Sequence, residues 1–183
     1  MPWRDQVLKG AYNYRMEDEQ TEILEDKVGR LLRQSGLTLS VAESCTGGLI
    51  SHKVTNVPGS SDYYVGSVTA YAYEVKVRLL GVSWSTLEQF GAVSREVALE
   101  MARGVRAALG ADIGLSVTGI AGPGGGTPDK PVGLTWIGFS SPEHEEARRF
   151  AWQGNRLQVK EQSAEAALQI LVEYLHKVVD GSD

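Results

Sequence analysis

The sequence is poor in cysteine and histidine, and this scarcity excludes several kinds of site. Its 183 residues include one cysteine and three histidines. A single cysteine forms no internal disulfide and offers no zinc-ligand spacing. His52 and His176 fall in predicted helices and His144 in a charged loop. None of the three stands beside a loop suited to a nucleophile, so a Ser-His-Asp arrangement is disfavoured.

The chain also lacks long apolar runs and clusters of basic residues. No stretch approaches the ~20 apolar residues that span a bilayer, and residues 1–20 lack the apolar core of a signal peptide. The net charge is −5, and only Arg148 and Arg149 are adjacent basic residues. Because nucleic-acid binding needs clustered Lys and Arg, no nucleic-acid partner is expected. We expect a cytoplasmic protein without a membrane partner.

What the chain does contain is the composition of one globular domain. Hydrophobic residues make up 42% and charged residues 22% of the sequence, a balance typical of folded rather than disordered proteins. Residues 1–19 are polar, contain scattered aromatics and show no clear periodicity. We predict an N-terminal arm or linker at 1–19, followed by a domain at 20–180.

Apolar spacing predicts about five strands interleaved with helices. The strands are expected at 37–42, 63–71, 112–119, 132–139 and 146–152. A first helix is expected from Glu19 to Gly36, and a short one after Gly48 to about Thr55. Further helices are expected at 74–80, 85–91, 94–109 and 155–179. Ser85 and Glu88 have the spacing of a capping box, and Asn155 is placed to cap the last helix. Because no helix separates the last two strands, the pattern indicates an α/β, mostly parallel sheet with at least one antiparallel neighbour.

Three unusual loops follow predicted strands. They are AESCTGG at 42–48, the segment after Tyr71, and TGIAGPGGG after 112–117. In parallel sheets, ligands bind beyond the carboxyl ends of the strands. Convergence of the three loops would therefore form one site.

The local chemistry of these loops leaves alternatives open. AESCTGG suits a polar or anionic ligand, because helix amides and glycines allow close approach, but a tight corner capped by Thr46 fits equally well. Cys45 is interpreted as a packing residue rather than a nucleophile. Residues 119–131 lack the Gly-Lys-Ser/Thr of a P-loop and form either a site wall or a flexible crossover. A serine activated by Lys76 is possible if the pKa of the lysine is depressed, and a surface lysine is the alternative.

Taken together, the motifs carry a resemblance. AESCTGGLIS, VPGSSDYY, VTAY…K…LLGV, GAVS, TGIAGPGGGTPDKPVG and GNR occur in one order between residues 42 and 156. In this arrangement the chain resembles the CinA C-terminal domain family, the nicotinamide mononucleotide deamidases, over roughly residues 20–178. The resemblance implies a three-layer α/β/α sandwich around a five-stranded mixed, mostly parallel sheet. It also implies an amidohydrolase of pyridine-nucleotide salvage, which converts nicotinamide mononucleotide to nicotinate mononucleotide and ammonia without a metal or other cofactor. Relatives suggest a homo-oligomer.

The resemblance also implies roles for individual residues. Ser61 of the P-G-S-S turn is expected as the nucleophile, with Lys76 as its base and Tyr71 relaying the proton or holding the hydroxyl. Ser44 is the rival nucleophile and is preferred as a hydrogen-bonding wall. Arg156 suits the substrate phosphate, because its planar fork binds two oxygens, and amides near Gly47 suit an oxyanion. The expected substrate contacts are Glu43, Ser44, Cys45, Thr46, Gly47, Thr118, Gly119 and Arg156.

Two residues depart from the family pattern. Tyr73 stands where the family commonly has asparagine, and Asn155 replaces the aspartate of G-D-R. Asn155 still suits a helix cap, whereas the bulk of Tyr73 is suited to crowding a pocket. The alternative to an enzyme is therefore a catalytically silent nucleotide-binding or interaction domain.

Overall fold

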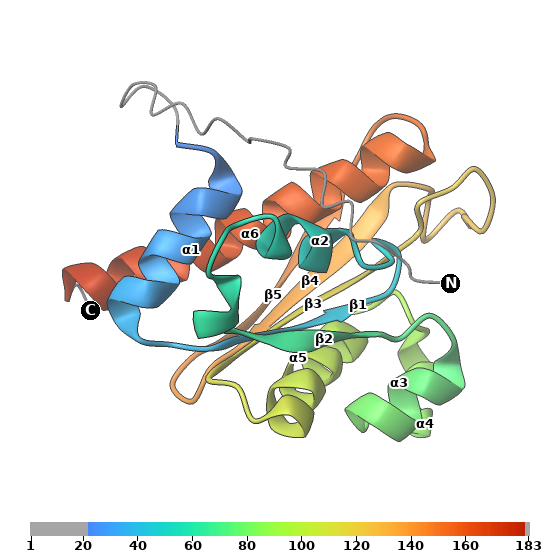
Figure 1. Ribbon diagram of the computed structural model, residues 1–183. Coiled ribbons are helices and arrows are strands. Elements are labelled where there is room, and N and C mark those ends of the chain that lie inside the picture. The colour runs from blue at the N-terminus through green and yellow to red at the C-terminus, as the bar shows by residue number, and fades with distance from the viewer. Residues whose placement is uncertain (1–21, 182–183) are drawn as a thin grey trace, which may run out of the picture.

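The computed structural model describes residues 22–181, and the predicted arm at 1–19 lies outside them. Within this part of the chain, five strands form one sheet in the order β2-β1-β3-β4-β5 (Figure 1). Both β2 and β3 pair with β1 in parallel, whereas β4 is antiparallel to β3 and to β5. Four strands therefore share one direction, which confirms the predicted mixed, mostly parallel sheet. The strands are β1 Leu39–Glu43, β2 Tyr64–Thr69, β3 Ile113–Gly119, β4 Leu134–Ser140 and β5 Glu145–Ala151.

Helices cover both faces of the sheet, which confirms the three-layer α/β/α sandwich (Figure 1). One face carries α1 Leu24–Ser35, α2 Leu49–Thr55 and α6 Arg156–Asp180. The other face carries α3 Tyr73–Leu80, α4 Trp84–Phe90 and α5 Arg95–Leu109. Each layer has its own apolar core, one around Leu115 and Leu168 and the other around Val97 and Met101. The burial of apolar side chains on both faces is what holds the layers together.

Local signals fix several helix ends as predicted. Gly36 ends α1 in the left-handed conformation, with φ at 69°. Asn155 begins α6 with a complete capping box formed with Gln158. The predicted capping box of Ser85 and Glu88 is wrong. The N-cap of α4 is Ser83, two residues before Ser85, and it makes no side-chain capping bond; the Ser85 hydroxyl instead pairs with that of Ser83 at 2.6 Å.

Close backbone contacts fix the position of α3 against its neighbour α5. A methyl group on Gly104 of α5 would overlap the backbone carbonyl of Leu80, the last residue of α3. Only a residue without a β-carbon allows this approach. The contact fixes the position of α3, and with it that of Lys76, relative to α5.

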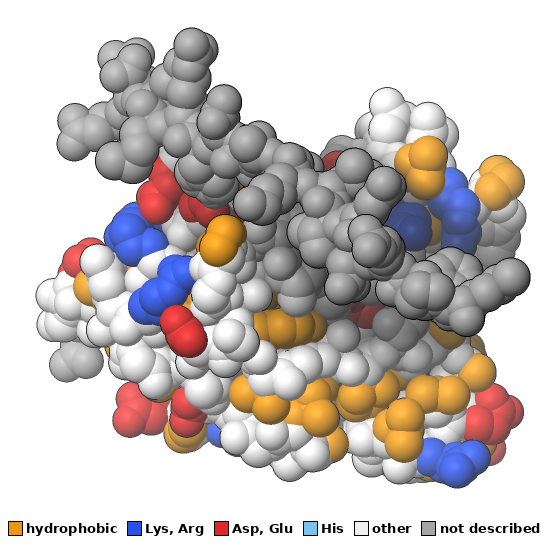
Figure 2. All heavy atoms as spheres, in the orientation of Figure 1, with side chains coloured by type: hydrophobic (Ala, Val, Ile, Leu, Met, Phe, Trp, Pro, Cys, Tyr) orange, Lys and Arg blue, Asp and Glu red, His pale blue; other side chains and the backbone are white. Residues whose placement is uncertain are grey.

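The surface seen in Figure 2 carries a band of hydrophobic side chains over β2 and α3. Val65 of β2 and Leu79 of α3 are about half exposed. Since β2 is an edge strand whose side chains alternate between half-buried and exposed, part of its surface stays uncovered. No helix within residues 22–181 is long and apolar enough to cross a membrane.

Candidate active site

The loops that follow β1, β2 and β3 line one hollow of about 300 Å³ at the carboxyl ends of these strands. Arg156, at the start of α6, also lines it. The predicted convergence of three loops is confirmed. The side chains discussed below that line the hollow are Ser44, Cys45, Tyr71, Tyr73, Lys76, Thr118 and Arg156.

Lys76 and Ser44 meet in this hollow. The Lys76 side chain is buried, with 1% exposed, and its Nζ donates to Ser44 Oγ at 3.1 Å and to the carbonyl of Ala70 at 2.5 Å. Burial lowers the pKa of the Lys76 amine to about 8, because the charged form loses solvation. A lysine with a pKa near neutrality is able to accept a proton from a neighbouring hydroxyl.

The expected pairing of Ser61 with Lys76 is wrong. Ser61 lies in the short 3₁₀ segment η1, Ser60–Asp62, which precedes β2, whereas the Lys76 amine contacts the residue that follows β2. Six residues of β2 separate these two ends by about 20 Å at ~3.3 Å per residue. Ser61 does not line the hollow, and Ser44 occupies the place expected for Ser61.

Tyr71 does not take the position expected for a proton relay. Its side chain is 61% exposed, and its phenolic oxygen accepts a hydrogen bond from Arg156 Nη2 at 3.0 Å. Its backbone carbonyl, not its hydroxyl, faces Lys76 Nζ, at 3.5 Å. Arg156 also donates from Nη1 to the carbonyl of Gly122 at 2.7 Å. Tyr71 and Arg156 thus join the loop after β2 to the glycine-rich loop at the rim of the hollow.

Glu43 is a structural residue rather than the expected substrate contact. Its buried carboxylate accepts hydrogen bonds from the amides of Gly48, Ile50 and Ser51 at 2.9–3.1 Å, and from the Ser51 hydroxyl at 2.6 Å. These bonds satisfy the first amides of α2 and neutralise the positive end of the helix. Glu43 therefore fixes the corner that carries Ser44, and those amides are not free for a ligand.

The interpretation of AESCTGG as a tight corner requires Thr46 to be the N-cap of α2. In the structure Gly48 takes that position. The Thr46 hydroxyl is buried, has no hydrogen-bond partner among residues 22–181, and does not line the hollow. Gly47 adopts a left-handed conformation with φ at 63°, which favours glycine. The residues between β1 and α2 therefore differ in role. Glu43 accepts hydrogen bonds from amides at Gly48 and beyond, but not from the amides of the turn at Cys45–Gly47.

Cys45 packs against Gly119, as its interpretation as a packing residue expects. It is 5% exposed, and a methyl group on Gly119 would lie 3.0 Å from its sulfur and 2.6 Å from the Thr135 hydroxyl. Burial raises the pKa of the Cys45 thiol to about 12, so the thiolate is not populated near neutrality. Thr118 is also buried and donates its hydroxyl proton to the carbonyl of Ala92 at 2.8 Å. Both residues form walls of the hollow.

The two departures from the family pattern leave the centre of the site intact. Tyr73 begins α3, is 44% exposed and lines the hollow without separating Ser44 from Lys76. Asn155 accepts from the amides of Leu157 and Gln158 and so keeps its capping function.

Lys160 is a residue near the site that sequence reasoning did not single out. It lies in α6, and a β-carbon on Gly47 would stand 3.8 Å from its Nζ. Residues four apart share a face of a helix. The four-residue spacing between Arg156 and Lys160 could therefore have indicated from the sequence that Lys160 lies near the site.

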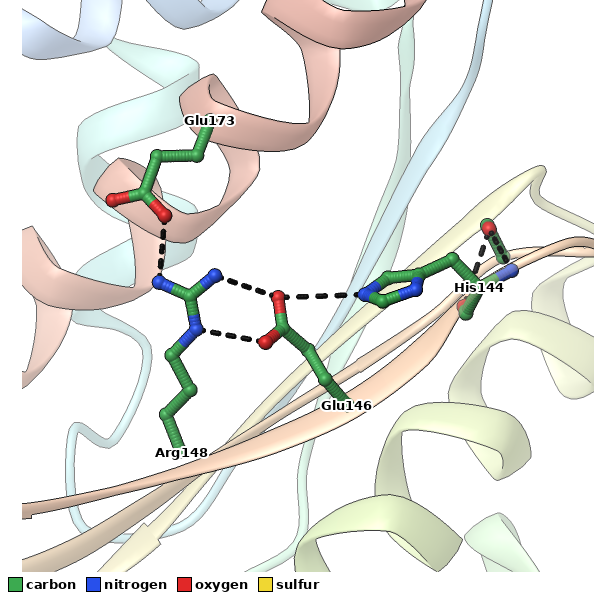
Figure 3. Close-up of polar contacts among 5 residues, drawn as sticks. His144, Glu146, Arg148 and Glu173 are labelled. Atoms are coloured by element: carbon green, nitrogen blue, oxygen red, sulfur yellow. Dashed lines mark hydrogen bonds and ion pairs between the residues drawn. The ribbon is translucent and has the colours of Figure 1, made fainter. Parts of the chain in front are cut away.

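A larger hollow of about 460 Å³ lies beside β5 and the end of α6, at the opposite end of the sheet. Figure 3 shows Arg148 between the carboxylates of Glu146 and Glu173, at 2.8 and 2.6 Å, with His144 3.6 Å from Glu146. These charges pair with one another, and Arg148 holds the pKa of Glu146 below its usual value. The contacts tie β5 to α6. No group of three or more His, Cys, Asp or Glu within residues 22–181 is placed to hold a metal ion.

The fold and the site define the class of the protein: an α/β/α sandwich domain with a part-buried serine–lysine contact at the carboxyl ends of its parallel strands. The chain belongs to the CinA C-terminal domain family, whose profile matches residues 21–175. A relative from Moorella thermoacetica is 51% identical over 88% of the chain, and a CinA-like protein from Salinibacter ruber is 52% identical over 80%. The matches cover 38% and 35% of these relatives, so the chain spans less than half of their length.

Solved structures agree with this assignment. A competence-damaged protein (CinA) superfamily protein from Klebsiella pneumoniae superimposes with a TM-score of 0.80 at 32% identity, over 83% of this chain and 95% of that chain. The competence/damage inducible protein CihA from Agrobacterium tumefaciens gives a TM-score of 0.79 at 34% identity, over 86% and 98%. The fold of residues 22–181 is therefore that of the superfamily.

Proposed function

We propose that the domain hydrolyses the carboxamide of nicotinamide mononucleotide to give nicotinate mononucleotide and ammonia, with Ser44 as nucleophile and Lys76 as base. The observation that carries this proposal is the 3.1 Å contact between Lys76 Nζ and Ser44 Oγ inside the hollow. Membership of the CinA C-terminal domain family supports it.

The contact suits two-step acyl transfer. Neutral Lys76 accepts the Ser44 proton as Oγ bonds to the carboxamide carbon, and the resulting ammonium protonates the leaving nitrogen when the C–N bond breaks. Ammonia departs and leaves an ester on Ser44. Water then gives a proton to Lys76 and attacks the ester, which releases the carboxylic acid and returns the proton to Ser44. The net change is one water consumed for each ammonia released.

The corner after Ser44 is proposed to stabilise the negative charge that develops on the carboxamide oxygen. Glu43 uses amides from Gly48 onward, so the turn at Cys45–Gly47 supplies the remaining donors. Preorganised donors of this kind contribute strongly to catalysis, because they need no reorientation during the reaction. Thr118 and Gly119, which line the hollow beside Cys45, are proposed as further substrate contacts.

The charge around the hollow suits an anionic substrate. Arg156 lines it, whereas the charge of Glu43 is taken up by helix amides. Arg156 makes its side-chain hydrogen bonds to neutral oxygens, those of Gly122 and Tyr71. Since Arg156 has no carboxylate partner among residues 22–181, its guanidinium is suited to a phosphate group.

Ammonia release from nicotinamide mononucleotide by the purified protein tests the proposal. We expect release by the wild type and its loss, by about a thousandfold or more, in Ser44→Ala and Lys76→Met. Release that matches a reaction without protein would contradict the proposed activity.

A catalytically silent nucleotide-binding domain is the second candidate, favoured by Tyr73, which lines the hollow. Calorimetric binding of nicotinamide mononucleotide without ammonia release would support it. The Tyr73→Asn variant separates the two candidates further. If Tyr73 restricts the hollow, the variant gains turnover, whereas a domain that lacks the chemistry gains none.

We propose that the domain acts in the cytoplasm in pyridine-nucleotide salvage and that it self-associates. Sedimentation measurement of the mass in solution tests the last point. Since the chain covers less than half of the relatives' length, activities of the longer proteins are not carried over.

A further inference from the structure

We propose that Lys160 and Arg156 form a phosphate subsite at the rim of the hollow, in which Lys160 makes the site selective for a phosphorylated substrate. The identity of that substrate rests on the function proposed above. The subsite itself rests on the placement and pairing of two cations.

The start of α6 places both side chains beside the site. The capping box of Asn155 and Gln158 fixes the first turn of the helix, and Arg156 and Lys160 follow on one face, one turn apart. Arg156 contacts the glycine-rich loop through Gly122. Lys160 reaches the corner after β1, where a β-carbon on Gly47 would lie 3.8 Å from its Nζ. The two cations therefore border the hollow on the side where α6 begins.

Neither cation has a carboxylate within 4.0 Å among residues 22–181. Five other basic side chains of residues 22–181 do have carboxylate partners, namely Arg30, Arg33, Lys53, Arg103 and Arg148. Lys53 contacts Glu25 at 3.4 Å and Glu161 at 2.6 Å, so the carboxylate next to Lys160 in sequence is already engaged. Figure 2 shows basic side chains gathered at the end of the molecule where α6 begins. Two cations that have no carboxylate partner among residues 22–181, in a chain of net charge −5, suit an anionic ligand.

The size of the hollow places that anionic group at the rim. About 300 Å³ is at the small end of ligand pockets. A substrate whose carboxamide ring reaches Ser44 therefore extends its ribose phosphate outward, toward Arg156. Lys160 does not line the hollow with Ser44. Gly47, which lies beside the Lys160 amine, does not line the hollow either, so Lys160 is assigned to the part of the substrate that extends out of it.

A comparison of two substrates tests this assignment. Nicotinamide riboside lacks only the phosphate of nicotinamide mononucleotide. In Lys160→Gln we expect KM for the mononucleotide to rise roughly tenfold or more, with kcat changed less than about threefold, and kinetics on the riboside unchanged. Lys160→Arg should restore KM, because it keeps the charge. Lys177→Gln, near the far end of the same helix, is the matched control and should behave as wild type.

An equal loss of kcat on both substrates would overturn the proposal, because it would place Lys160 at the reacting carboxamide. Unchanged discrimination between the two substrates would overturn it as well.

Binding of ribose 5-phosphate, which has no carboxamide, separates this inference from the proposed reaction. By calorimetry we expect the wild type to bind it about tenfold more tightly than Lys160→Gln. If that difference is found but no ammonia is released, the proposed function fails and the subsite stands. If ammonia is released but Lys160→Gln binds ribose 5-phosphate as tightly as wild type, the function stands and the subsite fails.

Discussion

The Lys76 amine donates to the Ser44 hydroxyl across 32 residues of sequence. The contact forms because β1 and β2 are parallel neighbours, so that the residue after β1 and the helix after β2 meet at one end of the sheet. The base is buried, and both side chains line the hollow.

The pH dependence of turnover should follow the Lys76 amine. Its pKa is lowered to about 8 by burial, and only the neutral amine accepts the Ser44 proton. At pH 7 roughly a tenth of the enzyme carries the neutral base. We therefore expect kcat/KM for nicotinamide mononucleotide to rise about tenfold per pH unit below pH 8 and to level off above it. Initial rates of ammonia release between pH 6 and 9.5 would show this. A plateau already reached at pH 6.5 would contradict the role of Lys76.

The same burial should make Lys76 unfavourable for folding at neutral pH. Between about pH 8 and 10.5 the unfolded chain binds a proton at Lys76 that the folded chain does not, so stability from this group rises with pH through that window and is absent below it. Lys76→Met should therefore be more stable than wild type at pH 7, by about 1–3 kcal/mol. The advantage should shrink toward pH 10. Urea unfolding of both proteins at the two pH values measures the difference, and a variant clearly less stable at pH 7 would refute the prediction.

Glu43→Gln should weaken both the fold and the activity. The amide has one acceptor oxygen in place of two, so it cannot satisfy the amides of Ile50 and Ser51 together with the Ser51 hydroxyl. We expect a loss of about 1–3 kcal/mol in the free energy of unfolding and a lower kcat, because the corner that carries Ser44 loses its anchor. Urea unfolding and steady-state kinetics measure the two effects. Glu22→Gln, which alters an exposed ion pair with Arg30, is the control and should lose less than about 1 kcal/mol.

Cys45 should be chemically silent in the folded protein. Its thiol is buried, and its pKa is raised to about 12. A thiol-specific disulfide reagent should label it slowly in buffer at pH 8 and fully in denaturant. Cys45→Ala should retain ammonia release within about threefold. Rapid labelling of the native protein accompanied by loss of activity would instead make Cys45 a reactive group.

Much of the fold was predictable from the sequence, because its signals are local. The apolar spacing around Leu31 and Leu32, the left-handed Gly36 and the capping Asn155 each act within a few residues. The sequence likewise predicted that three loops would converge, since the carboxyl ends of parallel strands lie together.

The pairing within the site was not predictable in the same way. Ser61 is closer to Lys76 in sequence than Ser44 is, but the length of β2 separates Ser61 from the site. The order of the motifs along the chain does not show at which end of a strand each motif lies. From the sequence, Glu43 was predicted to be a polar residue of a ligand-binding loop. In the structure its carboxylate instead accepts hydrogen bonds from the first amides of α2. These are contacts between different elements, and residue spacing does not specify them.

Ammonia release by Ser44→Ala and Ser61→Ala, measured side by side on nicotinamide mononucleotide, tests the central claim most directly. Both changes remove one hydroxyl, and only Ser44 contacts Lys76. We predict that Ser44→Ala releases no ammonia above the reaction without protein, whereas Ser61→Ala releases it at the wild-type rate. Loss of release in Ser61→Ala with retention in Ser44→Ala would contradict the assignment.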